Sequence, residues 1–350
     1  MKRRKFFSLA GLAAIAGSLA IACNNRPTAT VPTPESPATL VATGGELNIY
    51  SGRNEQLIGP LLERYEAATG TKINVRYGDT AELAAAILEE GQNSPADIFF
   101  GQDAGALGAL QRANRTKSLP ENILNKVDSR FRSPEGQWIG ISGRARVIDY
   151  NTELVNENEL PNSIWELTEE KWRGRVGWAP TNGSFQAFVT ALRLTEGDER
   201  ALEWLEAMRD NDAQVYSNNT TIVEALGRGE IELGLVNNYY LPRFQKENPN
   251  FPVAHHFTDS DAGSTINVAG VAIVDTTDHE EEAIALIEYL LTPESQEYFA
   301  QETNEYPLVT GVASPTDQVP LEQIKAPDID LSNLDDLEGT LNLLQQAGVL

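Results

Sequence analysis

Two patterns of apolar and polar positions alternate along most of this chain. Short apolar runs, which are typical of buried strands, are followed by stretches in which apolar residues recur every three or four positions, as in amphipathic helices. In the first third we predict strands at 47–50, 73–77 and 96–100, and helices at 55–69, 81–90 (capped by Thr80) and 104–112. Strands and helices that alternate with short connections predict a parallel sheet covered by helices on both faces.

The same pattern restarts in the middle of the chain. Residues 138–150 are a predicted run of strands that residues 142–146 interrupt. Later strands are predicted at 176–178, 215–216, 233–236 and 266–274, and helices at 185–195, 198–210, 220–226, 280–291, 294–303 and 337–347. Two similar patterns, with a late segment that returns to the first, predict an α/β fold of two lobes joined by two crossovers.

The predicted lobes have the following boundaries. Lobe 1 begins with 46–145, lobe 2 covers 146–267, lobe 1 resumes at 268–312, and the C-terminal segment 313–350 packs mainly on lobe 2. Ligands of such sheets bind beyond the carboxyl ends of the strands, near switch points in the strand order. The polar loops that fall at these ends are 51–54, 102–103, 182–184 and 237–240.

Tyr239 and Tyr240 stand where a predicted strand ends and a helix begins. The apolar run ends at Val236, two asparagines follow, and Pro242 suits the first turn of a helix. Adjacent side chains on a strand point to opposite faces, whereas two consecutive residues at such a corner can converge on one point. A buried phenol needs a partner, which a highly charged cation can supply. Packing of an aromatic pair at a loop is the alternative interpretation.

The first 45 residues are predicted to direct export. Residues 2–5 are basic and residues 6–22 are apolar and small, which is typical of a secretory signal and too short for a permanent span. Residues 3–7 also resemble a twin-arginine signal, so both export routes stay open. Cys23 is the only cysteine and ends a segment that resembles a lipoprotein cleavage box. We predict a signal peptide at 1–23, lipidation at Cys23 and a flexible linker at 24–45.

The net charge of the chain excludes some classes of binding partner. The formal net charge is −24, with 41% apolar and 22% charged residues, as in a soluble globular protein. Such a negative charge argues against nucleic acids and anionic membranes as partners. We expect a monomer in the periplasm or on the outer face of the cytoplasmic membrane, which touches the membrane only through a lipid anchor. Capture of a solute is the commonest task of such an exported, tethered, two-lobed protein.

Signals of catalysis are weak. The single cysteine lies in the targeting segment, and the sequence has no Gly-x-Ser-x-Gly motif. His255, His256 and His279 lack the spacing of a zinc site, so we interpret them as surface or hydrogen-bonded histidines. We predict a protein that is not an enzyme. An exported hydrolase or transferase is the alternative from another functional class.

The motif Asn237-Asn238-Tyr239-Tyr240 resembles the iron site of the bacterial ferric-ion-binding proteins, the solute-binding subunits of iron ABC importers. Further resembling segments follow in the same order at 47–53, 94–99, 143–147, 180–185, 305–308 and 345–348. The resemblance implies a type II periplasmic-binding-protein fold, in which two α/β lobes hold a ligand cleft at the hinge. It also implies that the protein binds Fe3+ and delivers it to an ABC permease. The same fold binding a polyamine, a thiamine-like cation or an oxyanion is the alternative.

The resemblance implies that Tyr239 and Tyr240 are phenolate ligands of the metal. Fe3+ is a hard cation that suits anionic oxygen donors, and it would drive the deprotonation of a phenol whose free pKa is near ~10. Elsewhere the chain departs from the family. Asn54 stands where some relatives have histidine, Gln102 where some have glutamate, and Phe185 where others have a third tyrosine. Since Asn54 and Gln102 are poor ligands for Fe3+, only the pair transfers cleanly.

The donors that complete the metal's coordination are left open. Asp103 is one candidate, with a helix N-cap as the alternative. A synergistic anion, carbonate or phosphate, is the other source, and a helix N-terminus at 182–184 suits an anion. Arginines add charge-assisted hydrogen bonds, although we expect one of them to pair with a structural carboxylate. The resemblance implies anion contacts at Asn182, Gly183 and Ser184 and weaker ones at Asn219 and Asn237, and the candidate arginines are Arg53, Arg144 and Arg146.

Overall fold

The computed structural model describes residues 44–315 and 318–350, which belong to one compact unit, Thr39–Leu350. The predicted signal peptide, the lipidation site Cys23 and nearly all of the predicted linker lie outside the described residues. Within the part of the chain that is described, no helix is long and apolar enough to cross a membrane.

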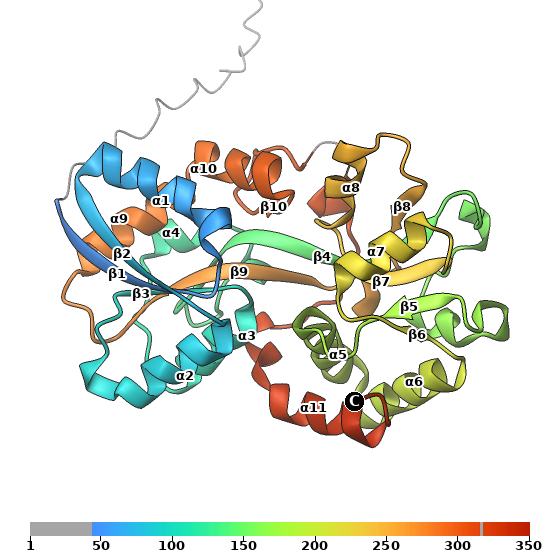
Figure 1. Cartoon of the computed structure of the whole chain (residues 1–350). Helices are drawn as coiled ribbons and strands as arrows, with labels where there is room; N and C mark the ends of the chain where they lie inside the picture. Colours follow the sequence, from blue (N-terminus) through green and yellow to red (C-terminus); the bar gives the residue numbers. More distant parts are fainter. Residues whose placement is uncertain (1–43, 316–317) are drawn as a thin grey trace, which may run out of the picture. The chain divides into compact units, whose positions relative to one another are not determined.

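The first half of the fold is built on a sheet in which β1 pairs in parallel with both β2 and β3. This parallel alignment confirms the prediction from the alternating pattern. β9 joins β3 in the antiparallel sense and leads on to β4. Figure 1 shows α1 and α9 on one side of this sheet and α2 and α3 on the other. The elements are β1 (Gly45–Ser51), α1 (Glu55–Thr69), β2 (Thr71–Tyr77), α2 (Thr80–Glu90), β3 (Ile98–Gly101), α3 (Ala104–Arg112), α4 (Glu121–Leu124), β9 (Ile266–Ile273), α9 (Glu280–Leu290), α10 (Pro293–Tyr298) and β10 (Tyr306–Pro307).

The second half is built on a sheet that shares β4 with the first. Here β4 pairs antiparallel with β7 and β8, and β5 lies parallel between β7 and β6. The elements of this half are β5 (Val176–Trp178), α5 (Gly183–Glu196), α6 (Asp198–Asp210), β6 (Gln214–Val215), α7 (Asn219–Gly227), β7 (Leu233–Asn237), α8 (Leu241–Glu247), β8 (Val253–His256) and α11 (Leu337–Gln346).

β4 (Ile139–Asn151) carries the chain from one half to the other. All 13 of its residues are buried, and the strand is continuous, so the predicted interruption at 142–146 is wrong. A shift of register lies between Gly140 and Ser142, and Arg146 is accommodated in the strand because its guanidinium donates to the polar groups described below. Up to Ala145 the strand pairs with β9, and from Arg146 it pairs with β7.

Signals at helix ends set several element boundaries. The Asn54 side chain accepts the Leu57 N–H as the N-cap of α1, and Gly70 ends this helix with a φ of +75°, a value that favours glycine. At α2 the predicted cap is wrong by one residue. Asp79 accepts two backbone N–H groups there, so Thr80 is the first helical residue.

The predicted helix at 294–303 is α-helical only in part. α10 ends at Tyr298, and η7 (Phe299–Thr303) is a π-helix that Asn304 ends with a φ of +58°. Single π-helical turns occur frequently near functional sites. This one leads directly into Glu305, which is buried.

Two hydrophobic clusters form the core. In the smaller cluster the rings of Trp178, Trp204, Phe185 and Phe188 meet at centroid distances between 5.4 and 6.2 Å. The C-terminal segment contacts both halves, because α11 packs on α5 and α6 whereas η9 (Leu331–Asp335) packs on α3. The predicted lobe boundaries stay a prediction.

Candidate functional site

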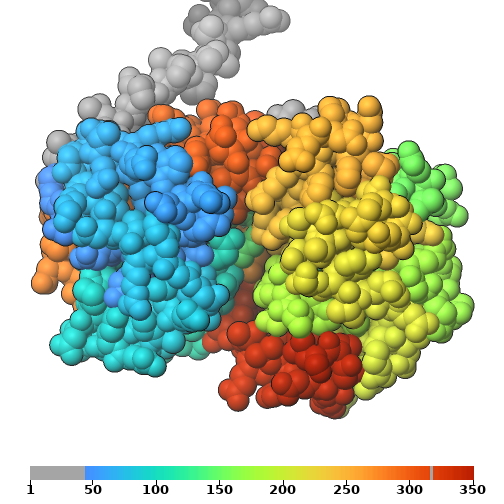
Figure 2. All heavy atoms as spheres, viewed as in Figure 1, coloured from blue at the N-terminus to red at the C-terminus, as the bar shows by residue number. Residues whose placement is uncertain are grey.

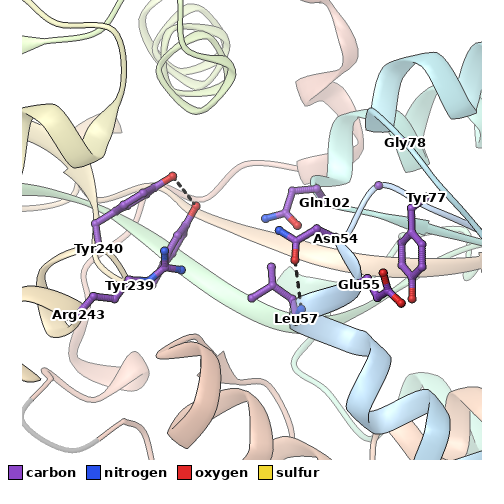
Figure 3. A pocket seen from close by; sticks show the side chains of 10 residues that line it. Asn54, Glu55, Leu57, Tyr77, Gly78, Gln102, Tyr239, Tyr240 and Arg243 are labelled. Carbon is purple, nitrogen blue, oxygen red and sulfur yellow. Dashed lines mark hydrogen bonds between the residues drawn. The ribbon is translucent and has the colours of Figure 1, made fainter.

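Tyr239 and Tyr240 lie at the corner between β7 and α8. Their rings are stacked, with centroids 4.5 Å apart and planes at 29°, and their hydroxyl oxygens are 3.3 Å apart. Figure 3 shows both phenols reaching into the same pocket. The geometry arises locally, since β7 ends at Asn237 and Pro242 lies in the first turn of α8. Two consecutive side chains thus converge, as predicted for a strand-to-helix corner.

The surroundings of the pair keep the Tyr240 phenol protonated in the absence of a cation. Burial raises the pKa of Tyr240 well above its ordinary value, and the neighbouring Tyr239 phenol adds to this shift. Arg243 and Arg144 act in the opposite direction. The Arg243 guanidinium lies 5.7 Å from the ring centroid of Tyr239 and 5.5 Å from that of Tyr240. A bound cation would therefore have to displace the phenolic protons.

Two cavities meet at the tyrosine pair and form one cleft. Their volumes are about 640 and about 630 Å³, within the range typical of ligand sites. Figure 2 shows the cleft as a hollow between the blue-to-cyan and the yellow-to-green residues. Both cavities are lined by Gly52, Gly78, Gln102, Tyr239 and Tyr240.

Asn54, Gln102 and Asp103 all line the cleft. Figure 3 shows Asn54 and Gln102 across the pocket from the two phenols. Asn54 caps α1, and Asp103 caps α3 by accepting the Ala106 N–H at 3.2 Å, which confirms the N-cap interpretation of Asp103. The Gln102 Oε1 accepts a hydrogen bond from Arg53 at 3.1 Å. Each of these three side chains therefore already has a structural partner.

Arg53 is the arginine that pairs with a structural carboxylate. Its side chain is fully buried, and it donates to both carboxylate oxygens of Glu305, at 2.7 and 2.6 Å. Burial alone would raise the pKa of Glu305, but the Arg53 guanidinium outweighs it and holds that pKa below its usual range. Arg53 does not line either cavity of the cleft. It is therefore placed to support the cleft rather than to face a ligand.

Arg146 contacts three of the other predicted anion contacts. Its Nη1 donates to Ser184 Oγ at 3.4 Å, Asn219 Oδ1 at 3.5 Å and Asn237 Oδ1 at 3.4 Å. Its Nη2 donates to the Leu235 carbonyl at 2.7 Å. Burial lowers the pKa of Arg146 to about 9, against the opposing effect of the two phenols, so the guanidinium stays cationic at neutral pH.

The start of α5 is open to the cleft beside this cluster. Asn182 caps α5 through the Ser184 N–H at 3.1 Å, and a side chain at Gly183 would meet nothing within 4 Å. Arg144 lines the same cavity, and its buried Nη1 has no hydrogen-bond partner among the described residues. A buried cationic group without a partner, next to a helix N-terminus, favours an anion.

The histidines have partners away from the phenols. His255 Nδ1 lies 2.5 Å from Asp149, His256 Nε2 lies 2.7 Å from the Pro161 carbonyl, and His279 Nδ1 lies 3.2 Å from Asp97. This confirms their interpretation as hydrogen-bonded residues. Within residues 44–315 and 318–350, no group of three or more His, Cys, Asp or Glu could hold a metal ion.

Sequence reasoning missed Arg243, Glu305 and Asn238. Arg243 could have been found, because it follows Tyr240 by three positions at the start of a helix and so shares a face with it. Glu305 lies 252 residues from Arg53, and no local pattern announces such a pair. Asn238, which lies between Asn237 and Tyr239 in the chain, is completely buried. Only its hydrogen bonds to residues distant in the chain distinguish it from Asn237.

Two α/β halves that share β4 and enclose a cleft define a two-lobed solute-binding protein. A family model described as bacterial extracellular solute-binding protein matches residues 61–326, and the chain belongs to this family. The resemblance predicted from the motifs is confirmed by the comparisons that follow.

Relatives and solved structures are similar over most of their length. The major ferric iron-binding protein of Neisseria meningitidis is 30% identical over 309 residues, which are 87% of this chain and 93% of the relative. Iron-bound HitA from Pseudomonas aeruginosa is 29% identical, with a TM-score of 0.79 over 87% of this chain and 99% of that one. A Trichodesmium protein (IdiA, FutA), solved with iron and citrate, is 30% identical, with a TM-score of 0.78 over 87% and 100%. The type II periplasmic-binding-protein fold is thereby confirmed.

Proposed function

We propose that this protein is an exported Fe3+-binding protein that delivers iron to the permease of an ABC importer. Its family captures solutes outside the cytoplasm, and similar proteins carry names or bound ligands that refer to ferric iron or iron. The single observation that carries the proposal is the convergence of the Tyr239 and Tyr240 hydroxyls, 3.3 Å apart, in the cleft.

Two phenolates suit Fe3+ for electrostatic reasons. A hard trivalent cation prefers anionic oxygen donors, and its charge displaces the protons of groups that it binds. Binding to both phenolates leaves a net charge of about +1 on the metal. Asn54 and Gln102 face the pair but offer only neutral oxygens, and Asp103 caps α3. The remaining coordination positions therefore call for an anion from solution.

We assign that anion, carbonate or phosphate, to the start of α5 and Arg144. Support comes from the open helix N-terminus at Gly183 and from the buried Arg144 Nη1 that lacks a partner among the described residues. Arg146 holds Ser184, Asn219 and Asn237 in place, and its own charge adds to the attraction. The anion would bring negative charge to the metal and satisfy the unpaired guanidinium at the same time.

The proposal includes the chain's location and its cycle. Residues 1–23 would direct export, and a lipid anchor at Cys23 would keep the protein at the outer face of the cytoplasmic membrane, near the permease. The protein would act as a monomer. The cleft would close on iron and release it when the cleft opens, when a phenolate is protonated or when the metal is reduced.

Visible absorbance tests this function. Ferric iron and carbonate are added to the purified metal-free protein, and a phenolate-to-iron charge-transfer band is expected. The band should be weakened or lost in Tyr239→Phe and in Tyr240→Phe. Tyr77→Phe is the matched control, because Tyr77 lines the same cavity at its opposite end, as Figure 3 shows. A wild-type protein that stays colourless would overturn the proposal.

A further inference from the structure

Asn238 precedes the tyrosine pair and makes two reciprocal hydrogen bonds with a single residue, Ala145. Its Oδ1 accepts the Ala145 N–H at 2.9 Å, and its own N–H donates to the Ala145 carbonyl at 3.0 Å. Asn238 has no exposed surface, so water does not compete for these bonds. The chain just before the phenols is thus held on β4 by two bonds in opposite directions.

Ala145 lies where β4 passes from one half of the fold to the other. It is the last residue of β4 that pairs with β9, opposite Ile266, and the next residue, Arg146, already pairs with Asn237 of β7. Figure 1 shows β4 running through both halves. Asn238 therefore binds β4 at the residue where its pairing changes from β9 to β7.

The side-chain amide of Asn238 reaches a third segment. Its Nδ2 donates to Gln318 Oε1 at 2.7 Å and to the Asn304 carbonyl at 3.3 Å. Asn304 ends the π-helix η7, and the following residue is Glu305, the partner of Arg53. The amide thus accepts a hydrogen bond from the crossing strand and donates to Asn304, in the segment that returns to the first half, and to Gln318.

We propose that Asn238 is a positioning residue that holds the Tyr239 and Tyr240 phenols in register with the point where the two halves join. This rests on the proposed function of the tyrosine pair. The pair follows directly on a residue that is tied at one end to β4 and at the other to residues 304 and 318, so the backbone that carries the phenols cannot move away from the cleft without breaking those bonds. Iron binding then gains from phenols that are already oriented before the metal arrives.

Iron affinity and the charge-transfer band of Asn238→Ala test this role. Loss of a group that orients metal ligands is expected to weaken iron binding by about tenfold or more and to shift the band. The matched control is Asn151→Ala. Like Asn238, Asn151 is a buried asparagine, and it is the last residue of β4. Its side-chain amide donates to the Leu226 carbonyl and accepts the Glu153 N–H, both within the second half. Asn151→Ala should lower the melting temperature while leaving affinity and band unchanged.

Two milder variants keep the test decisive if Asn238→Ala folds poorly. Asn238→Ser loses both bonds that the side-chain amide donates without adding a charge, and Gln318→Ala removes one partner without touching Asn238. Each should show a smaller shift in the same direction. Wild-type affinity and band in these folded variants would overturn the positioning role and leave the proposed function intact. A wild-type protein without any band would instead remove the proposed function, and the positioning role with it.

Discussion

The guanidinium of Arg53 and the carboxylate of Glu305 meet in two parallel hydrogen bonds of 2.7 and 2.6 Å inside the protein, although 252 residues separate them in the chain. Arg53 comes from the loop after β1, and Glu305 follows the π-helix η7. The pair therefore joins the start of the first half to the segment that returns to it, next to the cleft residue Gln102. A substitution at Arg53 or Glu305 should therefore lower the stability of the fold more than it changes the binding of a ligand in the cleft.

Glu305→Gln should strongly destabilise the fold. The substitution leaves the buried Arg53 guanidinium without a counter-charge, which costs about 3–5 kcal/mol of unfolding free energy. Urea unfolding measures this loss. The control is Glu230→Gln, which breaks an exposed, solvent-screened pair with Arg228 and should change the stability far less. Equal losses in the two variants would contradict a structural role for the buried pair.

The same pair predicts how stability depends on pH. Burial opposes ionisation of Glu305, but Arg53 outweighs it and holds the native pKa below the unfolded value of about 4.3. The stability from this carboxylate is therefore fully present above the unfolded pKa, and it is lost as the pH falls through the native pKa. Unfolding experiments between about pH 6 and pH 3 should show a steeper loss in wild type than in Glu305→Gln. Identical pH profiles would exclude this contribution.

Arg144→Gln should remove the contribution of the anion to iron affinity while leaving the phenols in place. The variant removes the cationic group whose Nη1 has no partner among the described residues, so carbonate should no longer raise iron affinity. At saturating carbonate we expect binding about tenfold weaker than in wild type. Competition with a coloured chelator at several carbonate concentrations measures both effects. Arg228→Gln, at an exposed arginine, should behave as wild type, and an unchanged carbonate dependence in Arg144→Gln would exclude Arg144 as the anion contact.

Iron binding should release the phenolic protons. Burial and the Tyr239 phenol raise the pKa of Tyr240, so this phenol is protonated in the metal-free protein at neutral pH. Two phenolates formed on binding mean that lower pH opposes binding, by up to about 100-fold in apparent affinity for each pH unit. Titration in weak buffer counts the protons directly. At saturating ferric nitrilotriacetate, Tyr239→Phe should release one proton fewer than wild type, and an equal count would exclude Tyr239 as a phenolate ligand.

The sequence predicts best what short-range patterns determine. The ends of α1, the parallel strands β1 to β3 and the convergence of Tyr239 with Tyr240 follow from caps, periodicity and a strand-to-helix corner. The continuity of β4 was not predicted, because the groups that accept hydrogen bonds from its Arg146 come from α5, α7 and β7. Partners distant in the chain give no local signal. The sequence therefore could not tell which of Arg53, Arg144 and Arg146 pairs with a structural carboxylate, and the structure shows that it is Arg53.

Asn238 shows the same limit within one motif. It stands beside Asn237 in the sequence, yet Asn237 receives Arg146 whereas Asn238 binds the crossing strand and the return segment. Alternation along the end of β7 separates the two side chains, but which segments receive them depends on long-range packing. A family motif can therefore mark a residue without saying what it does.

Resonance Raman spectroscopy of the iron-loaded protein tests the central claim most directly. Excitation within the charge-transfer band should enhance ring modes of metal-bound phenolate, and these modes should shift when the tyrosines carry ring deuterium. The account predicts enhanced modes in wild type and in Tyr77→Phe, and their weakening or loss in Tyr239→Phe and Tyr240→Phe. Iron bound tightly without any enhanced phenolate mode would contradict it.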